Sequence, residues 1–114
     1  MESYLLLFHE SNQYSKLSPE EMQAIFGRFR NWSQKLRDAG RIINSNKLED
    51  SSGRVLRGKN GAVQITDGPF TETKDVVGGY FLINAESYEE AVELSRDCPH
   101  LDFGAIEIRR IQKM

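Results

Sequence analysis

The stretch DGPFTETKDVVGGY, residues 67–80, decides the fold because it joins turn chemistry to the start of an apolar strand. Asp67, Gly68 and Pro69 favour a turn, since aspartate bonds to nearby backbone, glycine accepts positive φ and proline keeps the preceding residue out of the helical region. The residues that follow mix hydroxyl, carboxylate and ammonium groups before an apolar run restarts. We therefore expect a structured loop that is either the rim of a ligand site or a solvated connection.

Two strand-like runs precede this loop, at residues 55–56 and 62–66, and they flank the sequence Gly-Lys-Asn-Gly at 58–61. An Asn-Gly pair between such runs is a strong short-range signal for a β-hairpin, because both residues tolerate the positive φ of a tight turn. We expect a hairpin that leads directly into the loop.

Two helices are predicted from their N-terminal sequences. Residues 18–21, Ser-Pro-Glu-Glu, combine an N-cap serine, a proline at the first helical position and a glutamate that completes a capping box. Apolar residues then recur every three or four positions until Gly40, which we expect to end the helix. A second capping box, from Ser87 to Glu90, opens a shorter helix that Pro99 stops. The inward residues expected on the first helix are Met22, Ile25, Phe26, Phe29, Trp32 and Leu36. Those expected on the second are Tyr88, Ala91, Val92 and Leu94.

Residues 4–8, Tyr-Leu-Leu-Leu-Phe, are apolar at every position. Because strand side chains alternate between faces, such a run predicts a strand that is buried on both faces. Further strands are expected from residue 41, over 78–83 and over 105–111. The resulting order of elements predicts an α+β fold, a split βαβ sandwich with an inserted hairpin, in which two helices cover one face of an antiparallel sheet.

Helices on one face leave the other face of this sheet uncovered. Leu5 and Leu7 point away from Tyr4, Leu6 and Phe8, so an apolar set remains on the uncovered face whichever set the helices cover. An apolar patch of this kind favours association by roughly 25 cal/mol per Å². We therefore predict a homodimer in which the two sheets face each other.

Size and composition set the remaining limits. The chain has 114 residues, which is enough for one hydrophobic core, so we expect a single domain over residues 1–114. A net charge of −2 and a pI of about 5.7 provide no attraction to nucleic acid or to anionic membranes. The sequence has one cysteine, no signal segment and no run of about 18 apolar residues, which predicts a cytoplasmic protein that does not enter a membrane.

These motifs resemble the DGPF branch of the YCII-related family, most members of which are small bacterial proteins. The resemblance is carried by residues 67–70, 71–74 and 78–80 and extends over nearly the whole chain. It implies a ferredoxin-like fold that assembles as a dimeric α+β barrel, and an association with extracytoplasmic-function sigma factors. A related branch is thought to pair a histidine on the first helix with an aspartate before a proline, and some relatives act on lactones. Here Phe29 stands at the histidine position and Cys98 precedes Pro99, so the chain departs from that pair.

Polar residues predict a ligand pocket between the sheet and the loop. Its expected members are His9, Asp67, Phe70, Glu72, Lys74, Tyr80, Glu107 and Arg109. His9 ends the first strand, where an imidazole can serve as a catalytic acid or base near neutral pH, with Asp67 to orient it or to bind substrate. The alternatives are a surface histidine and an aspartate bonded to its own turn.

The other members are expected to bind the ligand. Glu107 and Arg109 point to the same side of the last strand, and charges on a covered face are paired either with each other or with a ligand. Tyr80 either offers its phenol to the same cavity or packs as an aromatic residue. Glu72 and Lys74 form either an acid and cation pair at the pocket mouth or a solvated pair.

Cys98, His100 and Asp102 alternate after the second helix and are all possible metal ligands. A structural zinc site takes four such ligands, and the sequence has no second cluster, so we predict no metal and no cofactor. Cys98 is expected to be a buried residue at the helix end rather than a nucleophile.

Three functions follow as hypotheses. The first is a homodimer that binds a small polar or anionic molecule without a cofactor. The second is an enzyme acting on a small lactone or related acid, with His9 as general base and Arg109 holding a carboxylate. The third is a non-catalytic interaction module that serves a sigma factor.

Overall fold

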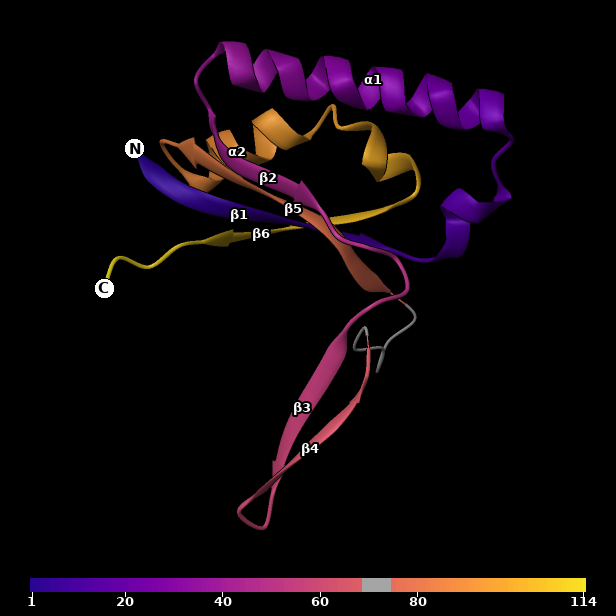
Figure 1. Ribbon diagram of the computed structural model, residues 1–114. Coiled ribbons are helices and arrows are strands. Elements are labelled where there is room, and N and C mark those ends of the chain that lie inside the picture. The colour runs from indigo at the N-terminus through magenta and orange to yellow at the C-terminus, as the bar shows by residue number, and fades with distance from the viewer. Residues whose placement is uncertain (69–74) are drawn as a thin grey trace.

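The computed structural model describes residues 1–68 and 75–114, apart from the side chains of Asn12 and Gln13 (Figure 1). Its main sheet contains four antiparallel strands in the order β2-β5-β1-β6. Their bounds are Glu2–Glu10 for β1, Ile42–Lys47 for β2, Val76–Ala85 for β5 and Gly104–Arg110 for β6. The predicted α+β class is confirmed, and this strand order is consistent with the ferredoxin-like fold.

Both helices lie on the same side of this sheet (Figure 1). Helix α1 spans Pro19–Asp38 and helix α2 spans Tyr88–Ser95. A 3-10 helix, η1, Asn12–Lys16, joins β1 to α1, and a second one, η2, Pro99–Asp102, joins α2 to β6. Within the described residues, no helix is both long and apolar enough to cross a membrane.

The helix ends follow the chemistry predicted for them, with one difference. The Ser18 hydroxyl accepts a hydrogen bond from the Glu21 amide at 3.1 Å, and the Glu21 carboxylate accepts one from the Ser18 amide at 3.0 Å. Gly40 follows α1 with φ of 71°, the left-handed conformation expected of a C-terminal cap. At α2, Ser87 caps the Glu90 amide, but the Glu90 carboxylate accepts from the Glu86 amide and from Arg41 instead of completing the box.

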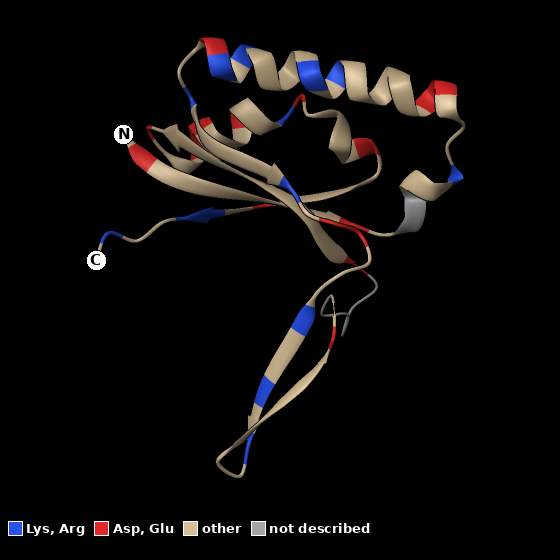
Figure 2. Ribbon diagram, viewed as in Figure 1, with Lys and Arg blue, Asp and Glu red and all other residues tan. Residues whose placement is uncertain are grey.

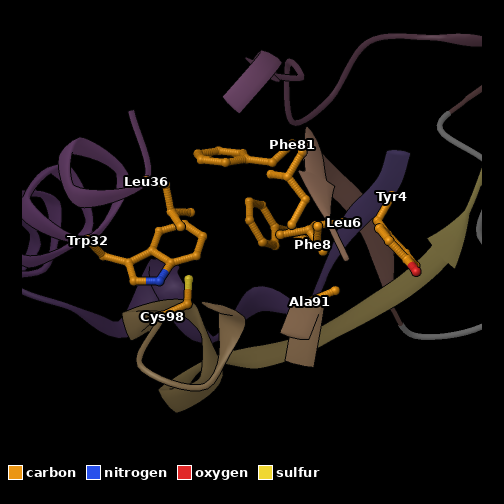
Figure 3. Packing of buried hydrophobic residues seen from close by; sticks show 10 residues of the cluster. Tyr4, Leu6, Phe8, Trp32, Leu36, Phe81, Ala91 and Cys98 are labelled. Atoms are coloured by element: carbon orange, nitrogen blue, oxygen red, sulfur yellow. The ribbon is translucent and has the colours of Figure 1, made fainter. Parts of the chain in front are cut away.

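The hydrophobic core lies between the helices and the sheet. Its buried residues are Tyr4, Leu6, Phe8, Trp32, Leu36, Phe81, Ile83, Ala85, Ala91 and Cys98. Figure 3 shows Trp32 and Leu36 reaching from α1 toward Phe8 and Phe81 of the sheet. Three residues predicted to point inward, Phe26, Tyr88 and Val92, are instead exposed. Tyr88 nevertheless contacts the sheet, because its ring packs edge to face on that of Tyr4 with centroids 5.0 Å apart.

The predicted hairpin is confirmed. Strands β3, Arg54–Lys59, and β4, Ala62–Asp67, pair only with each other among the described strands. Asn60 and Gly61 form its turn with φ of 53° and 77°, the paired positive values of a type I′ turn. Figure 1 shows the hairpin projecting away from the main sheet.

The outer face of the main sheet, opposite the helices, is partly apolar as predicted. Leu5 and Leu7 of β1 pair with Leu82 and Tyr80 of β5, and all four side chains are half-buried in the single chain. We call this surface the outer face.

Candidate functional site

A cavity of about 490 Å³ lies between α1 and the helix-covered face of the sheet. Its walls are largely aromatic, with Phe8 and Phe81 from the sheet and Phe29 from α1. These rings meet edge to face, with centroids 5.2 to 5.8 Å apart. Phe26 is 52% exposed and lines the cavity as well. Its exposed side chain is therefore part of the cavity wall.

A pair of glycines opens the strand that forms the cavity floor. Gly78 and Gly79 are buried, and the register between β1 and β5 shifts beside them, between Phe8 and His9. A side chain on Gly78 would place its Cβ only 2.4 Å from the carboxyl carbon of Glu10. The bare backbone of Gly78 therefore lets the Glu10 carboxylate lie across the strand at the cavity wall.

A relay of hydrogen bonds forms the polar end of the cavity. The Tyr14 hydroxyl lies 2.8 Å from Nδ1 of His100, and Nε2 of His100 lies 2.9 Å from the backbone oxygen of His9. Because a carbonyl oxygen only accepts, Nε2 carries the hydrogen and donates it. In the neutral imidazole Nδ1 is then an acceptor, and the Tyr14 hydroxyl donates to it. His100 is only 3% exposed, so this relay satisfies a buried polar side chain.

Burial, followed by the negative charge of Glu10, raises the pKa of Tyr14 to about 12. The phenol is therefore protonated at neutral pH, in agreement with its role as donor to His100. Gly104 makes the relay possible, because a Cβ there would lie 2.1 Å from the His9 oxygen and 2.9 Å from Nε2 of His100.

Two cationic residues also line the cavity. Arg37 of α1 and Lys47 of β2 both line it. The Lys47 ammonium is held by the Asp50 carboxylate at 2.7 Å and by the backbone oxygen of Leu48 at 2.6 Å. Arg37 donates a hydrogen bond to the Ser33 hydroxyl at 3.5 Å, which is a long and therefore weak contact.

A second polar group lies on the outer face. Nε2 of His9 is 2.8 Å from a carboxylate oxygen of Glu107, and Arg109 lies 3.7 Å from the other oxygen of the same carboxylate. Tyr80 shares this face, and its hydroxyl accepts a hydrogen bond from Asn46 at 2.9 Å. The strand register accounts for the grouping, since Glu107 pairs with Leu7 and Arg109 pairs with Leu5.

The model of the YCII-related domain matches residues 3–114 of this chain. The chain belongs to the YCII-related family. It is also similar to an uncharacterized protein of Rhizobium meliloti, with 28% identity over 108 residues, covering 92% of this chain and 87% of that protein.

Within this YCII-related domain, the residues predicted for the pocket are divided between separate places. The structure brings His9, Tyr80, Glu107 and Arg109 onto the outer face, and none of the four lines the cavity. Asp67 lies on β4 of the hairpin, with a side chain that is 92% exposed and 3.6 Å from Arg54. Phe70, Glu72 and Lys74, also predicted for the pocket, lie outside the described residues.

The described start of the DGPF motif closes the hairpin. The Gly68 amide donates to the Gly53 oxygen at 3.0 Å, and a Cβ on Gly68 would lie 3.2 Å from the Arg54 nitrogen. Asp67 pairs with Arg54 in the strand register and also through its side chain. Glycine at this position is thus explained by the close approach of two backbones.

The three possible metal ligands after α2 have different surroundings in this YCII-related domain; they are Cys98, His100 and Asp102. Cys98 is buried in the core, and its burial raises the thiol pKa to about 12, which leaves it a protonated, inert thiol at neutral pH. His100 points into the cavity, and Asp102 lies 3.6 Å from Arg28. Among the described residues, no group of three or more histidine, cysteine or acidic side chains is arranged to hold a metal ion.

Glu10, Tyr14 and His100 were not predicted as a group. They come from β1, η1 and η2, and no spacing in the sequence links them. The one local signal was the Gly-Gly pair at 78–79, which lies near the start of an otherwise apolar strand and indicates close approach of another group.

Proposed function

We propose that this YCII-related domain binds a small molecule in the cavity between α1 and the sheet. The observation that carries the proposal is an aromatic cavity of about 490 Å³ with the Glu10, Tyr14 and His100 side chains gathered at one end. Pockets for small ligands are typically apolar concavities of roughly 300–1,000 Å³ with a few polar groups that fix orientation. The volume suits a molecule with one ring or a short chain.

The polar groups at the wall restrict the ligand further. Glu10 offers a carboxylate, which accepts hydrogen bonds, and Phe8, Phe29 and Phe81 offer ring surfaces. We infer a ligand with a flat or chain-like apolar body and a hydrogen-bond donor directed at Glu10. Arg37, which also lines the cavity, suits an anionic group, in keeping with the small polar or anionic partner predicted from the sequence.

The aromatic character of the wall favours binding over the chemistry of the related branch. Phe29, the residue that stands where that branch is thought to carry its histidine, is part of the wall and packs edge to face on Phe8. A phenyl ring contributes apolar contact and has no proton to transfer. We therefore propose ligand binding as the first candidate function and catalysis as the second.

The test compares two glutamate variants on opposite faces of the sheet. A panel of aromatic and short-chain amines, amino acids and carboxylic acids is screened by ligand-observed NMR, and the affinity of each hit is measured by calorimetry. Hydrogen bonds to charged groups contribute about 1.5–3 kcal/mol, so Glu10→Gln is expected to weaken binding by roughly 10- to 100-fold. Glu107→Gln on the outer face is the control and is expected to leave affinity unchanged. Equal affinities in the two variants would refute the cavity as the site.

The contact between His9 and Glu107 favours a second candidate. A carboxylate 2.8 Å from Nε2 of His9 orients the imidazole, as in many acid and base pairs. We propose as the alternative an enzyme that acts on a small lactone or related acid, with His9 as general base and Arg109 binding a carboxylate. A turnover assay on simple lactones would decide this, because a pH-rate profile that is the same for His9→Ala and for the unmodified protein removes His9 from the chemistry.

We also propose that the protein is a homodimer that pairs through the outer face. Leu5, Leu7, Tyr80 and Leu82 supply the apolar surface, which the helices do not cover. Such pairing would turn the outer face into the interior of a dimeric barrel and enclose the His9 and Glu107 pair. Analytical ultracentrifugation at micromolar concentration is expected to report a particle of twice the 13.1 kDa chain mass.

A further inference from the structure

Two consecutive glycines of β5 lie between an acidic and a basic residue. A Cβ on Gly78 would lie 2.5 Å and 2.7 Å from the two carboxylate oxygens of Glu10, which ends β1. A Cβ on Gly79 would instead meet β2, 3.0 Å from the Asn46 backbone oxygen and 3.5 Å from Cα of Lys47. Strands β1 and β2 are the two neighbours of β5 in the sheet. Glu10 and Lys47, which both line the cavity, therefore flank the glycine pair from opposite sides.

This arrangement suits a ligand that carries two opposite charges close together. Consecutive Cα atoms are about 3.8 Å apart, so the positions that Glu10 and Lys47 approach are neighbours along β5. A ligand group between the two side chains then needs a hydrogen-bond donor and an acceptor within a few ångströms of each other. The head group of an α-amino acid meets this need, because its ammonium and carboxylate groups are attached to the same carbon.

The present partner of Lys47 can be replaced by a ligand carboxylate at small cost. The Lys47 ammonium binds the Asp50 carboxylate at 2.7 Å, and the two side chains are 63% and 78% exposed. Figure 2 shows basic and acidic residues following one another where β2 ends. Exposed ion pairs contribute little to stability, so a ligand competes with Asp50 on nearly equal terms. Arg37, the other cation that lines the cavity, comes from α1 and not from the strands beside the glycines.

The rest of the wall indicates the side chain of such a ligand. Phe8, Phe29 and Phe81 line the cavity with aromatic rings, which suit an apolar group. We propose that the ligand is an amino acid with an apolar side chain, whose ammonium group binds Glu10 and whose carboxylate binds Lys47. Its side chain packs on the phenyl rings. This inference rests on the proposed function and names the class of ligand that the cavity takes.

Two sets of three compounds test whether both charges are needed. Phenylalanine, phenethylamine and phenylpropionate share one ring and one linker, and the second and third lack the carboxylate and the ammonium group respectively. Leucine, isopentylamine and isocaproate repeat the comparison with a branched chain. Calorimetry measures each affinity. At least one of the two amino acids is expected to bind roughly tenfold more tightly than either of its analogues, because each missing charge removes a charged hydrogen bond.

Four variants assign each charge to its residue. Glu10→Gln is expected to weaken the amino acid and the amine by roughly 10- to 100-fold without weakening the acid. Lys47→Gln is expected to weaken the amino acid and the acid by roughly threefold or more, while the amine is unaffected. Asp50→Asn removes the competing carboxylate and is expected to tighten both of these ligands by about two- to fivefold. Lys59→Gln, at the end of β3 in the hairpin, is the matched control and is expected to change none of the affinities.

The outcomes separate this inference from the proposed function, and circular dichroism verifies that each variant folds. The inference is overturned if the amines bind as tightly as the amino acids, or if Lys47→Gln leaves the binding of amino acids and acids unchanged. In either case a loss of amine binding in Glu10→Gln still supports the cavity as the ligand site. Binding that is independent of Glu10 for every compound, or no binding of any of the six, overturns the inference. Independence from Glu10 would refute the cavity as well.

Discussion

Gly104→Ala adds a single methyl group, and the structure predicts that this change lowers the stability of the fold strongly. The new Cβ would lie 2.1 Å from the backbone oxygen of His9, far inside van der Waals contact, and the obstacle is backbone rather than a mobile side chain. It would also lie 2.9 Å from Nε2 of His100, the atom that donates to this same oxygen. One methyl group is thus expected both to force β6 away from β1 and to break the hydrogen bond that orients His100.

The magnitude follows from these two terms. Overpacking a tight site costs about 1–3 kcal/mol, and a lost buried hydrogen bond costs about 1 kcal/mol more. We expect the free energy of unfolding to fall by about 3 kcal/mol. For a domain of this length that corresponds to a decrease in Tm of roughly 12 °C.

Gly27→Ala is the matched control, because nothing lies within 4 Å of the Cβ position at Gly27 in α1. Alanine has the higher helix propensity, so this variant is expected to gain about 0.5–1 kcal/mol. Urea denaturation monitored by circular dichroism measures both changes. Two glycine-to-alanine variants with equal stability, or a Gly104→Ala protein as stable as the unmodified one, would show that the approach of β6, β1 and η2 is not as close as described.

Two further predictions concern ionisation and capping. The pKa of Tyr14 is raised to about 12, so between pH 10 and 12 the unfolded state loses this proton while the folded state keeps it, and stability falls as the pH rises through that window. Spectrophotometric titration of the phenols near 295 nm is expected to show a late transition that Tyr14→Phe abolishes, and its persistence in that variant would assign it to another tyrosine. Ser18→Ala removes the hydroxyl that accepts from the Glu21 amide and is expected to cost about 1 kcal/mol of unfolding free energy, whereas Ser18→Thr retains most of it. Equal denaturation midpoints for the two Ser18 variants would contradict this.

The elements of the fold were predictable because their signals are local. Ser18 and Glu21 lie three residues apart, so a capping box can be identified from the sequence, and Asn60-Gly61 indicates its own turn for the same reason. The run at residues 4–8 is apolar at every position, and the side chains of a strand point alternately to its two faces. The run therefore also identified two apolar faces of one strand. The outer-face grouping of Glu107 and Arg109 followed from the same alternation.

The cavity was not predictable, because its polar end comes from three separate segments. Glu10, Tyr14 and His100 approach one another only after β1, η1 and η2 have packed, and no local pattern records that distance. The sequence therefore determined the helices, the strands, the hairpin and the two apolar faces of the sheet, since each depends on residues a few positions apart. Only the tertiary structure decided that a cavity opens under α1 and that Gly78 leaves room there for a carboxylate. It also decided that His100 lines this cavity and does not form a metal site with Cys98.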